Sequence, residues 1–243
     1  MTFAARPIGL HVGAFVFTPT ISADTSDYNL KAAAIAAGWD QVTPLLATVT
    51  VGAGIVLSAT ATSGYGFDTG ATFPAGTVLT LICQGYICGM GGAGGSGSGS
   101  PGGQKQAGIG GPALRAQYPI SIDAAGGVIA GGGGGGGGDA PNGGNYDGGG
   151  GGGRTGRTNS AAGYGANQGT FTKGGDGSGG WGIGGTTGPG GYSGTSPNWY
   201  GGGGGGGWGA NGGGLGAAAG GAAVVGNSYI TWINTGTRYG AIT

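Results

Sequence analysis

Few side chains in this chain of 243 residues could carry out chemistry, and none of them lies in a pattern that catalysis needs. His11 is the single histidine and lies in an apolar stretch, so a catalytic triad or a histidine-based metal site has nothing to build on. All eight acidic residues are aspartates, and no two of them stand in a convincing context for glycoside hydrolysis. We therefore predict neither enzyme activity nor a cofactor.

Metal and sulfur chemistry is equally weakly indicated. Residues 139–147 contain aspartates and asparagines that could offer oxygen ligands to Ca²⁺, but their spacing fits no calcium-loop pattern, so a solvated loop is favoured. Cys83 and Cys88 flank Gly85. If this segment is a hairpin, the two cysteines lie on its opposite arms, slightly out of register. We predict no metal site.

Glycine dominates the composition, with 73 of the 243 residues, and eight Lys and Arg balance eight Asp. Disorder usually goes with high net charge, which is missing here. Collagen needs a glycine at every third residue, a membrane-spanning helix needs about 20 continuous apolar residues, and the chain has neither. Neutral charge also removes the case for binding nucleic-acid phosphates. These observations favour a structural or adhesive protein.

The uneven distribution of glycine divides the chain into three parts. Ten glycines lie in residues 1–88, 60 lie in residues 89–223 and three lie in residues 224–243. We predict a small β-rich domain at 1–88, a glycine-rich domain at 89–223 and a C-terminal β segment at 224–243 that closes the body. The predicted fold class is therefore mainly β and irregular.

The first part contains one helix signal among strand signals. Asp27 is a good N-cap for a short helix from Tyr28 to Ala37, and Gly38 is well placed to follow its end. A helix this short must pack on other elements. The β-rich runs available to it lie at 14–17, 46–51, 55–57 and 77–82.

A sequence motif that precedes glycine runs occurs twice, and a third variant of it lies near the C-terminus. Residues 79–89 and 120–130 align with one residue inserted, and each reads as a short strand, a glycine turn, a second apolar pair and then glycines. Residues 229–242 carry the third variant. Internal repetition indicates a repeated architectural unit rather than an irregular linker.

The glycine runs at 131–138, 148–153 and 201–207 have two competing interpretations. As linkers they would be flexible coils. As polyproline II strands packed side by side, they could pair backbone N–H and C=O groups, because the missing Cβ lets backbones approach closely. Composition alone leaves both open. Matched run lengths and the interleaved aromatic residues favour the second, a polyglycine II bundle or sandwich.

Aromatic side chains occur in the segments that separate or edge the glycine runs, at 139–147, 154–173 and 186–200. These segments also contain Asn, Ser, Thr, Gly and Pro, a mixture typical of antibody loops. We therefore predict loops that recognise a partner, although any single aromatic, such as Trp181 or Trp208, fits a minor core over glycine faces as well. The candidate receptor-binding residues are Tyr146, Arg154, Arg157, Tyr164, Phe171, Trp181, Tyr192, Trp199, Tyr200 and Trp208.

Several phrases resemble a family of glycine-rich tail proteins of bacteriophages, identified as tail-fibre or receptor-binding proteins. The resemblance is carried by residues 29–40 (NLKAAAIAAGWD), the phrase around Gly85, the eight-glycine run and residues 230–240 (ITWINTGTRYG). It touches nearly the whole chain. In composition the body is also similar, more distantly, to the polyglycine II tail-fibre tip adhesins of T-even-like phages.

This resemblance implies a virion component at the distal tail that contacts a bacterial surface receptor, either an outer-membrane protein or a glycan. Residues 1–88 would be the attachment domain that docks on other tail proteins. Neither membrane insertion nor a nucleic-acid partner is expected. Assembly in the reducing host cytoplasm favours buried thiols at Cys83 and Cys88 over a disulfide.

Two questions stay open at this point. A homotrimer suits the symmetry of a fibre, whereas a single capping subunit suits the more distant relatives. The alternative to an adhesin is a non-adhesive structural component, in which the glycine-rich body is a spacer between other proteins of the tail tip.

Overall fold

Each strand of this protein pairs with strands from earlier or later parts of the chain rather than with the next strand in sequence. Every pairing between named strands in the described ranges is parallel. The computed structural model describes residues 13–96, 105–138, 151–163, 166–178, 182–188, 190, 202–214 and 216–243. Its strands form three sheets.

The order of strands is simple in each sheet. The first sheet has the order β1 (Phe15–Phe17), β5 (Leu45–Val51), β8 (Val78–Cys83), β11 (Ile120–Asp123), β14 (Ile230–Asn234), with β2 (Thr20–Ile21) also on β5. The second has the order β3 (Thr25–Ser26), β6 (Val56–Ser58), β9 (Tyr86–Cys88), β12 (Val128–Ala130), β15 (Thr237–Tyr239). The third has the order β4 (Tyr28–Asn29), β7 (Phe67–Asp68), β10 (Leu114–Arg115), β13 (Val224–Val225).

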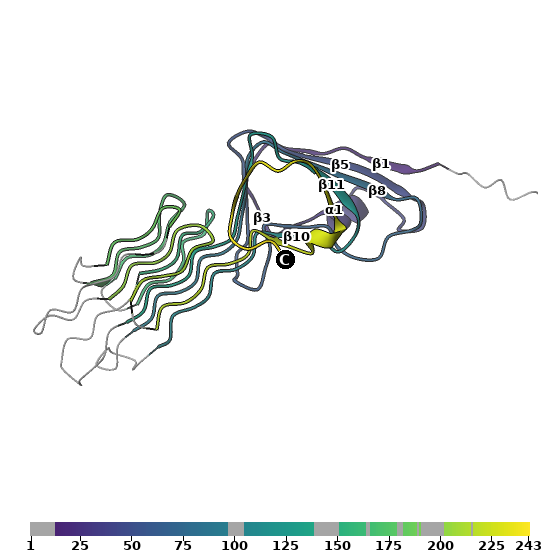
Figure 1. Ribbon diagram of the computed structural model, residues 1–243. Coiled ribbons are helices and arrows are strands. Elements are labelled where there is room, and N and C mark those ends of the chain that lie inside the picture. Colours follow the sequence, from purple (N-terminus) through teal and green to yellow (C-terminus); the bar gives the residue numbers. More distant parts are fainter. Residues whose placement is uncertain are drawn as a thin grey trace, which may run out of the picture.

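The chain visits the first, second and third sheets in the same order on each turn. Stacked turns of this kind make a three-sided parallel β-solenoid, in which each turn buries its apolar side chains against its neighbours. Figure 1 shows the solenoid with β1, β5, β8 and β11 along one side. The fold is thus mainly β with one short helix, as the sequence predicts.

The solenoid core follows from alternation along the strands. In β5 the buried positions are Leu45, Ala47, Val49 and Val51, and the residues between them are less buried. Successive side chains of a strand point to opposite faces, so one set fills the interior. Parallel register then stacks the same kind of residue on every turn, and Val49, Leu81 and Ile122 lie opposite one another in this way.

The repeat predicted from the sequence is confirmed by the strand register. Leu79 pairs with Ile120 in the first sheet, and Tyr86 pairs with Val128 in the second. The extra residue of the later copy therefore lies in the connection between the two sheets. The third variant forms β14 and β15, which pair with β11 and β12.

The hairpin considered for Cys83 and Cys88 is wrong. β8 and β9 belong to different sheets, and Gly85 forms a corner of the solenoid between them. The corners themselves stack, since the N–H of Tyr86 donates to the carbonyl of Ile55 at 2.8 Å and the N–H of Val128 donates to that of Gly85 at 2.9 Å. A Cβ at Gly85 would overlap the carbonyl oxygen of Ile55, so only glycine fits.

The predicted helix exists but is shorter at its start. α1 spans Leu30–Ala36, and its N-cap is Asn29, whose side chain accepts a hydrogen bond from the N–H of Ala32 at 2.8 Å. Asp27 is not the cap, because its carboxylate accepts from the N–H and hydroxyl of Thr60. Gly38 has φ +101° and follows the helix end, as predicted.

Two glycine-rich segments leave the solenoid at equivalent points of consecutive turns. One follows β9 and returns at β10, and the other follows β12 and returns at β13, so each connects the second sheet to the third. We call residues 89–113 and 131–223 together the glycine body. In Figure 1 their traces run side by side away from the solenoid, toward the lower left.

Backbone hydrogen bonds donated by residues 132–137 repeat with a period of three. Donors three residues apart reach the same neighbouring segment, over distances of 2.7 to 2.9 Å. Gly132 and Gly135 donate to Gly111 and Gly108, Gly133 and Gly136 donate to Arg154 and Gly151, and Gly134 and Gly137 donate to Ala210 and Gly213.

The carbonyl groups of the same run follow the same rule with other neighbours. Gly134 and Gly137 accept from Gly206 and Gly203, Gly132 and Gly135 accept from Gly221 and Ala218, and Gly133 and Gly136 accept from Gly92 and Gly95. Residues 131–137 therefore lie at the centre of the described body, surrounded by backbone. Backbone pairing satisfies the buried polar groups there without side chains.

The three predicted domains at 1–88, 89–223 and 224–243 stay a prediction. Strands β10 to β12 fall inside the middle range and pair with strands of the first and third ranges. The middle range thus contributes both to the solenoid and to the glycine body.

Candidate functional site

The glycine body covers the outer face of the second sheet. Leu57, Ile87 and Ile129, at the middle of its strands, belong to the solenoid core. The flanking residues Val56, Cys88 and Ala130 instead join a second cluster with Trp208, which comes from the body. They are at most 1% exposed although they lie on the outer face of the sheet.

Trp208 is the centre of an aromatic cluster at this junction. Its ring centroid lies 6.0 Å from that of Tyr86, 6.0 Å from that of Tyr239 and 5.4 Å from that of Phe171. Tyr86 and Phe171 meet edge to face at 5.3 Å. These separations are those of favourable aromatic pairs. Two of the four rings belong to the solenoid and two to the glycine body.

Arg154 lies over the same tryptophan and is 9% exposed. Its guanidinium carbon is 3.4 Å from the ring centroid of Trp208. Its Nε donates to the carbonyl of Phe171 at 2.8 Å, and its Nη1 donates to that of Thr186 at 2.6 Å. Burial lowers the pKa of Arg154 from its ordinary value. The cation is held by two carbonyl dipoles and an aromatic face.

Two further contacts tie the segment after Arg154 to the solenoid. Gly156 lies so close to the second sheet that a Cβ there would overlap Cβ of Ser58. Arg157 forms an ion pair with Asp24, with 2.7 Å between Nε and Oδ2, and its side chain stays 51% exposed. Such exposed pairs contribute little to stability.

These positions separate the ten candidate residues into two groups. Arg154, Phe171 and Trp208 come together at the junction, and Arg157 lies at its rim, 5.1 Å over the ring of Phe171. The others lie outside the described residues: Tyr146, Tyr164, Trp181, Tyr192, Trp199 and Tyr200.

The sequence analysis missed Tyr86 and Tyr239, which supply the solenoid half of the cluster. Both occur in the repeated phrase immediately before a glycine-body segment or the chain end. Alternation along β9 and β15 places them on the outer side, because Ile87 faces the core between Tyr86 and Cys88. An aromatic residue at an outward position next to a glycine run was the available signal.

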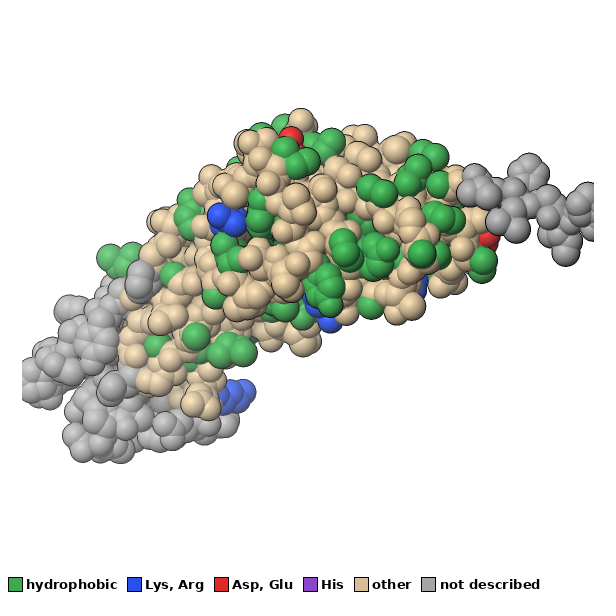
Figure 2. Space-filling model, turned by 45° about the vertical axis from the view of Figure 1, so that its right-hand side comes forward, with side chains coloured by type: hydrophobic (Ala, Val, Ile, Leu, Met, Phe, Trp, Pro, Cys, Tyr) green, Lys and Arg blue, Asp and Glu red, His purple; other side chains and the backbone are tan. Residues whose placement is uncertain are grey.

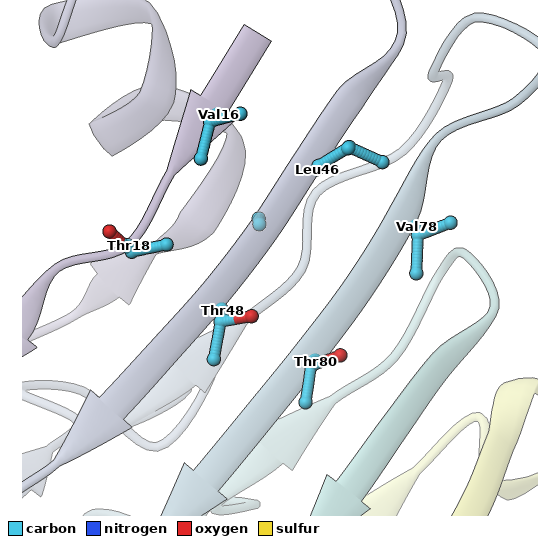
Figure 3. Close-up of a pocket in the computed structure, with 7 residues that line it drawn as sticks. Val16, Thr18, Leu46, Thr48, Val78 and Thr80 are labelled. Atoms are coloured by element: carbon cyan, nitrogen blue, oxygen red, sulfur yellow. The ribbon is translucent and has the colours of Figure 1, made fainter. Parts of the chain in front are cut away.

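The outer face of the first sheet is differently built. Val16, Leu46 and Val78 align across β1, β5 and β8 and are 66%, 39% and 55% exposed. Threonines continue the face beside them, and a shallow groove of about 280 Å³ runs between these side chains. Figure 3 shows them side by side on neighbouring strands. Figure 2 shows a surface of the molecule on which charged side chains are sparse.

The two cysteines are free and buried. Burial raises the pKa of Cys83 and of Cys88 to about 12, which keeps both thiols protonated near neutral pH. Within the described ranges, His, Cys, Asp and Glu nowhere gather in a group of three that could hold a metal ion. The described helices are also too short or too polar to cross a membrane.

The comparisons with known proteins agree with this geometry. Residues 16–243 match the model of the family described as phage tail fibre adhesin Gp38. The fold is similar to that in the crystal structure of the gp37-gp38 adhesin tip complex of the bacteriophage S16 long tail fiber, with a TM-score of 0.65 and 24% sequence identity. The alignment covers 95% of this chain and 82% of that one. No curated protein matches the chain.

The family match begins within β1 and extends to the end of the chain, so it covers the other solenoid strands and the whole glycine body. It covers nearly all of the chain, including every candidate residue. A tail fibre adhesin is a structural protein of the virion tail. The chain belongs to the phage tail fibre adhesin Gp38 family.

Proposed function

We propose that this adhesin recognises a bacterial surface receptor through the segments that connect the rods of the glycine body. One observation carries the proposal. Residues 131–137 are glycines surrounded by the backbone of neighbouring segments, so this central run has no side chains to offer a ligand. We therefore infer that recognition uses the connecting segments, whose aromatic and small polar residues are typical of binding loops.

We also propose that the glycine body is a bundle of polyglycine II helices. A polyproline II helix has three residues per turn, so every third N–H points in the same direction. The period of three in the hydrogen bonds of residues 131–137 supports this. None of residues 131–136 has a positive φ in the left-handed region. This agrees with the polyproline II helix, whose φ is about −75°.

We assign the ten candidate residues to two roles. Tyr146, Tyr164, Trp181, Tyr192, Trp199 and Tyr200 are proposed as receptor contacts. Arg154, Phe171 and Trp208 are proposed as interior residues, because they pack on the second sheet. Arg157, at the exposed rim, stays a candidate contact. The receptor is an outer-membrane protein or a surface glycan, and no catalytic step is proposed.

The uncovered outer face of the first sheet is proposed as the surface that docks on the tail. It presents an apolar row of Val16, Leu46 and Val78 with threonines beside it. In Figure 1 this side of the solenoid is turned away from the glycine body. The similar solved structure is itself a complex with gp37, which supports a fibre protein as the partner. The adhesin would then lie at the distal end of the tail.

The receptor proposal is tested by binding of fluorescently labelled full-length protein to host cells. We expect saturable binding that is abolished when residues 139–147 and 191–200 are exchanged for those of an adhesin with another host. The exchanged protein should keep its circular dichroism spectrum and melting temperature. Unchanged binding by the exchanged protein would contradict recognition through these two segments, whereas no binding by the folded wild type would favour the spacer function.

The docking proposal is tested with the purified fibre protein that ends the tail. Val78→Asp places a charge in the apolar row and should abolish co-elution with the fibre protein, whereas Val42→Asp, at an exposed position outside the row, should have no effect. Light scattering of the adhesin alone distinguishes a monomer from a homotrimer. Loss of a trimer in Val78→Asp would assign the face to self-association.

A further inference from the structure

Two parts of very different construction meet at the aromatic cluster. The solenoid is held by stacked apolar side chains, whereas the described glycine body is held by backbone hydrogen bonds. The chain passes between them where β9 and β12 run directly into glycine. Gly89 and Gly131 donate backbone hydrogen bonds to Ala130 and Tyr239 at these connections, but glycine has no side chain that could pack there and fix the angle between the two parts.

Arg154 links segments of the body that are distant in sequence. Its backbone belongs to the hydrogen-bonded array, because its N–H donates to Gly206 and its carbonyl accepts from Gly133. Its side chain leaves the array and donates to the carbonyls of Phe171 and Thr186. One residue therefore connects a central rod to two outer segments.

Trp208 links the same residues to the solenoid. One face of its ring receives the guanidinium of Arg154, and the rings of Tyr86 and Tyr239 of the second sheet lie tilted beside it, each with its centroid at 6.0 Å. Its indole N–H points to the carbonyl of Thr155 at 3.3 Å. The neighbouring Gly207 and Gly209 belong to the glycine array, and Gly209 donates to Gly131. The indole is thus fixed from both sides.

We propose that Arg154 and Trp208 form a joint that sets the orientation of the glycine body relative to the solenoid. They act as positioning residues, since they fix the direction in which the connecting segments face without touching a receptor. The second half of this inference rests on the proposed receptor-binding function, whereas the joint itself does not. A planar guanidinium suits the role because it stacks on the indole and donates in two fixed directions at once.

The joint is tested by the distance between two spin labels in the full-length protein. The labels are placed at Val42→Cys in the solenoid and Ile183→Cys in the body, both of which are exposed positions. Cys83 and Cys88 are buried, so the native thiols should not take up label. The wild-type joint should give one narrow distance distribution.

Arg154→Met, which removes the charged fork, should broaden and shift this distribution. Arg154→Lys keeps the charge but has no planar fork, and it should give an intermediate width. Trp208→Phe should resemble Arg154→Met. The matched control is Lys173→Met, which removes another cation of the glycine body whose ion pair with Asp176 lies within the body, and it should leave the distribution unchanged.

Melting curves, compared with the distance distributions, distinguish a role of Arg154 in orientation from a role in stability alone. An Arg154→Met protein that melts earlier but keeps the wild-type distance distribution overturns the proposal. If this variant does not fold, Arg154→Lys decides: a wild-type distribution overturns the proposal and a broadened one supports it. Affinity for host cells should fall about tenfold in Arg154→Lys, equivalent to about 1.4 kcal/mol. If the exchange of residues 139–147 and 191–200 leaves host-cell binding unchanged, recognition through these segments is refuted. The distance result for the joint would still be valid.

Discussion

At the scale of single residues, side chains are excluded from much of the glycine body by the neighbouring backbone. A Cβ on Gly134 would overlap the carbonyl oxygen of Ala218, and one on Gly135 would overlap that of Ala93. Gly188, by contrast, has open space around its Cβ position. Glycine is therefore required at the first two positions because of close backbone approach, whereas Gly188 tolerates a side chain.

This difference predicts opposite outcomes for two alanine substitutions. Gly134→Ala should destabilise the protein by about 1–3 kcal/mol or more, because the rigid backbone around it cannot make room for a methyl group. Gly188→Ala should leave the free energy of unfolding unchanged within about 0.5 kcal/mol. Denaturant unfolding of both variants measures the difference. Equal stability of the two proteins would contradict close packing around residue 134.

The buried thiols predict a loss of stability at alkaline pH. Burial raises the pKa of Cys83 and Cys88 from 9.0 to about 12. The unfolded protein therefore releases these protons at lower pH than the folded one. The contribution is complete below pH 9 and is lost as the pH rises toward 12, by up to about 1.4 kcal/mol per pH unit for each thiol.

Urea midpoints between pH 8 and 11 measure this effect. A Cys83→Ala/Cys88→Ala variant should lose less stability across the range, with Tyr28, whose pKa burial raises to about 12, still contributing. Wild-type and double-variant curves that run parallel would show that the thiols titrate alike in both states. Near neutral pH, a thiol reagent should react with the wild type only after unfolding.

At the scale of elements, the sequence predicted the strands better than their pairing. The runs at 46–51, 55–57 and 77–82 correspond to β5, β6 and β8 within one residue. A glycine between two apolar runs, such as Gly85, signals a change of direction, but a hairpin and a solenoid corner give the same local signal. Only the repeat at 120–130 indicated stacking, because repeated units pair with each other.

Local sequence signals also did not predict which candidate residues come together. Loop composition grouped Arg154 and Trp208 with the other aromatic positions, and the structure brings these two together against Tyr86 and Tyr239. Their burial depends on the outer face of the second sheet, where the contacting residues come from four strands on separate turns. No local pattern around residue 154 or 208 contains that information.

The equivalent exit points of the glycine body predict that the solenoid can be closed without it. In the second turn, residues 59–66 alone connect β6 to β7. Replacing residues 89–113 and 131–223 by copies of this connection should leave a protein with a β-type circular dichroism spectrum and one cooperative melting transition. It should not bind host cells.

Failure of this shortened protein to fold would mean that the solenoid and the glycine body depend on each other. That outcome would contradict the expectation that the solenoid can be closed without the glycine body. Because Tyr86, Val128 and Tyr239 would become exposed in the shortened protein, the experiment should include detergent-free and low-concentration conditions.

At the scale of the whole molecule, the three sides of the solenoid have different surroundings. The second sheet carries the glycine body, and the first presents an apolar row that we assign to the tail. The third contains the ion pair between Arg115 and Asp68, with 2.6 Å between Nη2 and Oδ2. This arrangement places the proposed docking face and the described glycine body on separate parts of the molecule (Figure 1).

The central claim is that the glycine body is an ordered scaffold, and amide hydrogen exchange of the full-length protein tests it most directly. Each N–H of residues 131–137 has a backbone acceptor within 3.0 Å. We expect these amides to exchange as slowly as those of β5 and β8, because both sets open only when the surrounding structure opens. Exchange of residues 131–137 at the rate of an unfolded chain would contradict the scaffold and leave a flexible linker in its place.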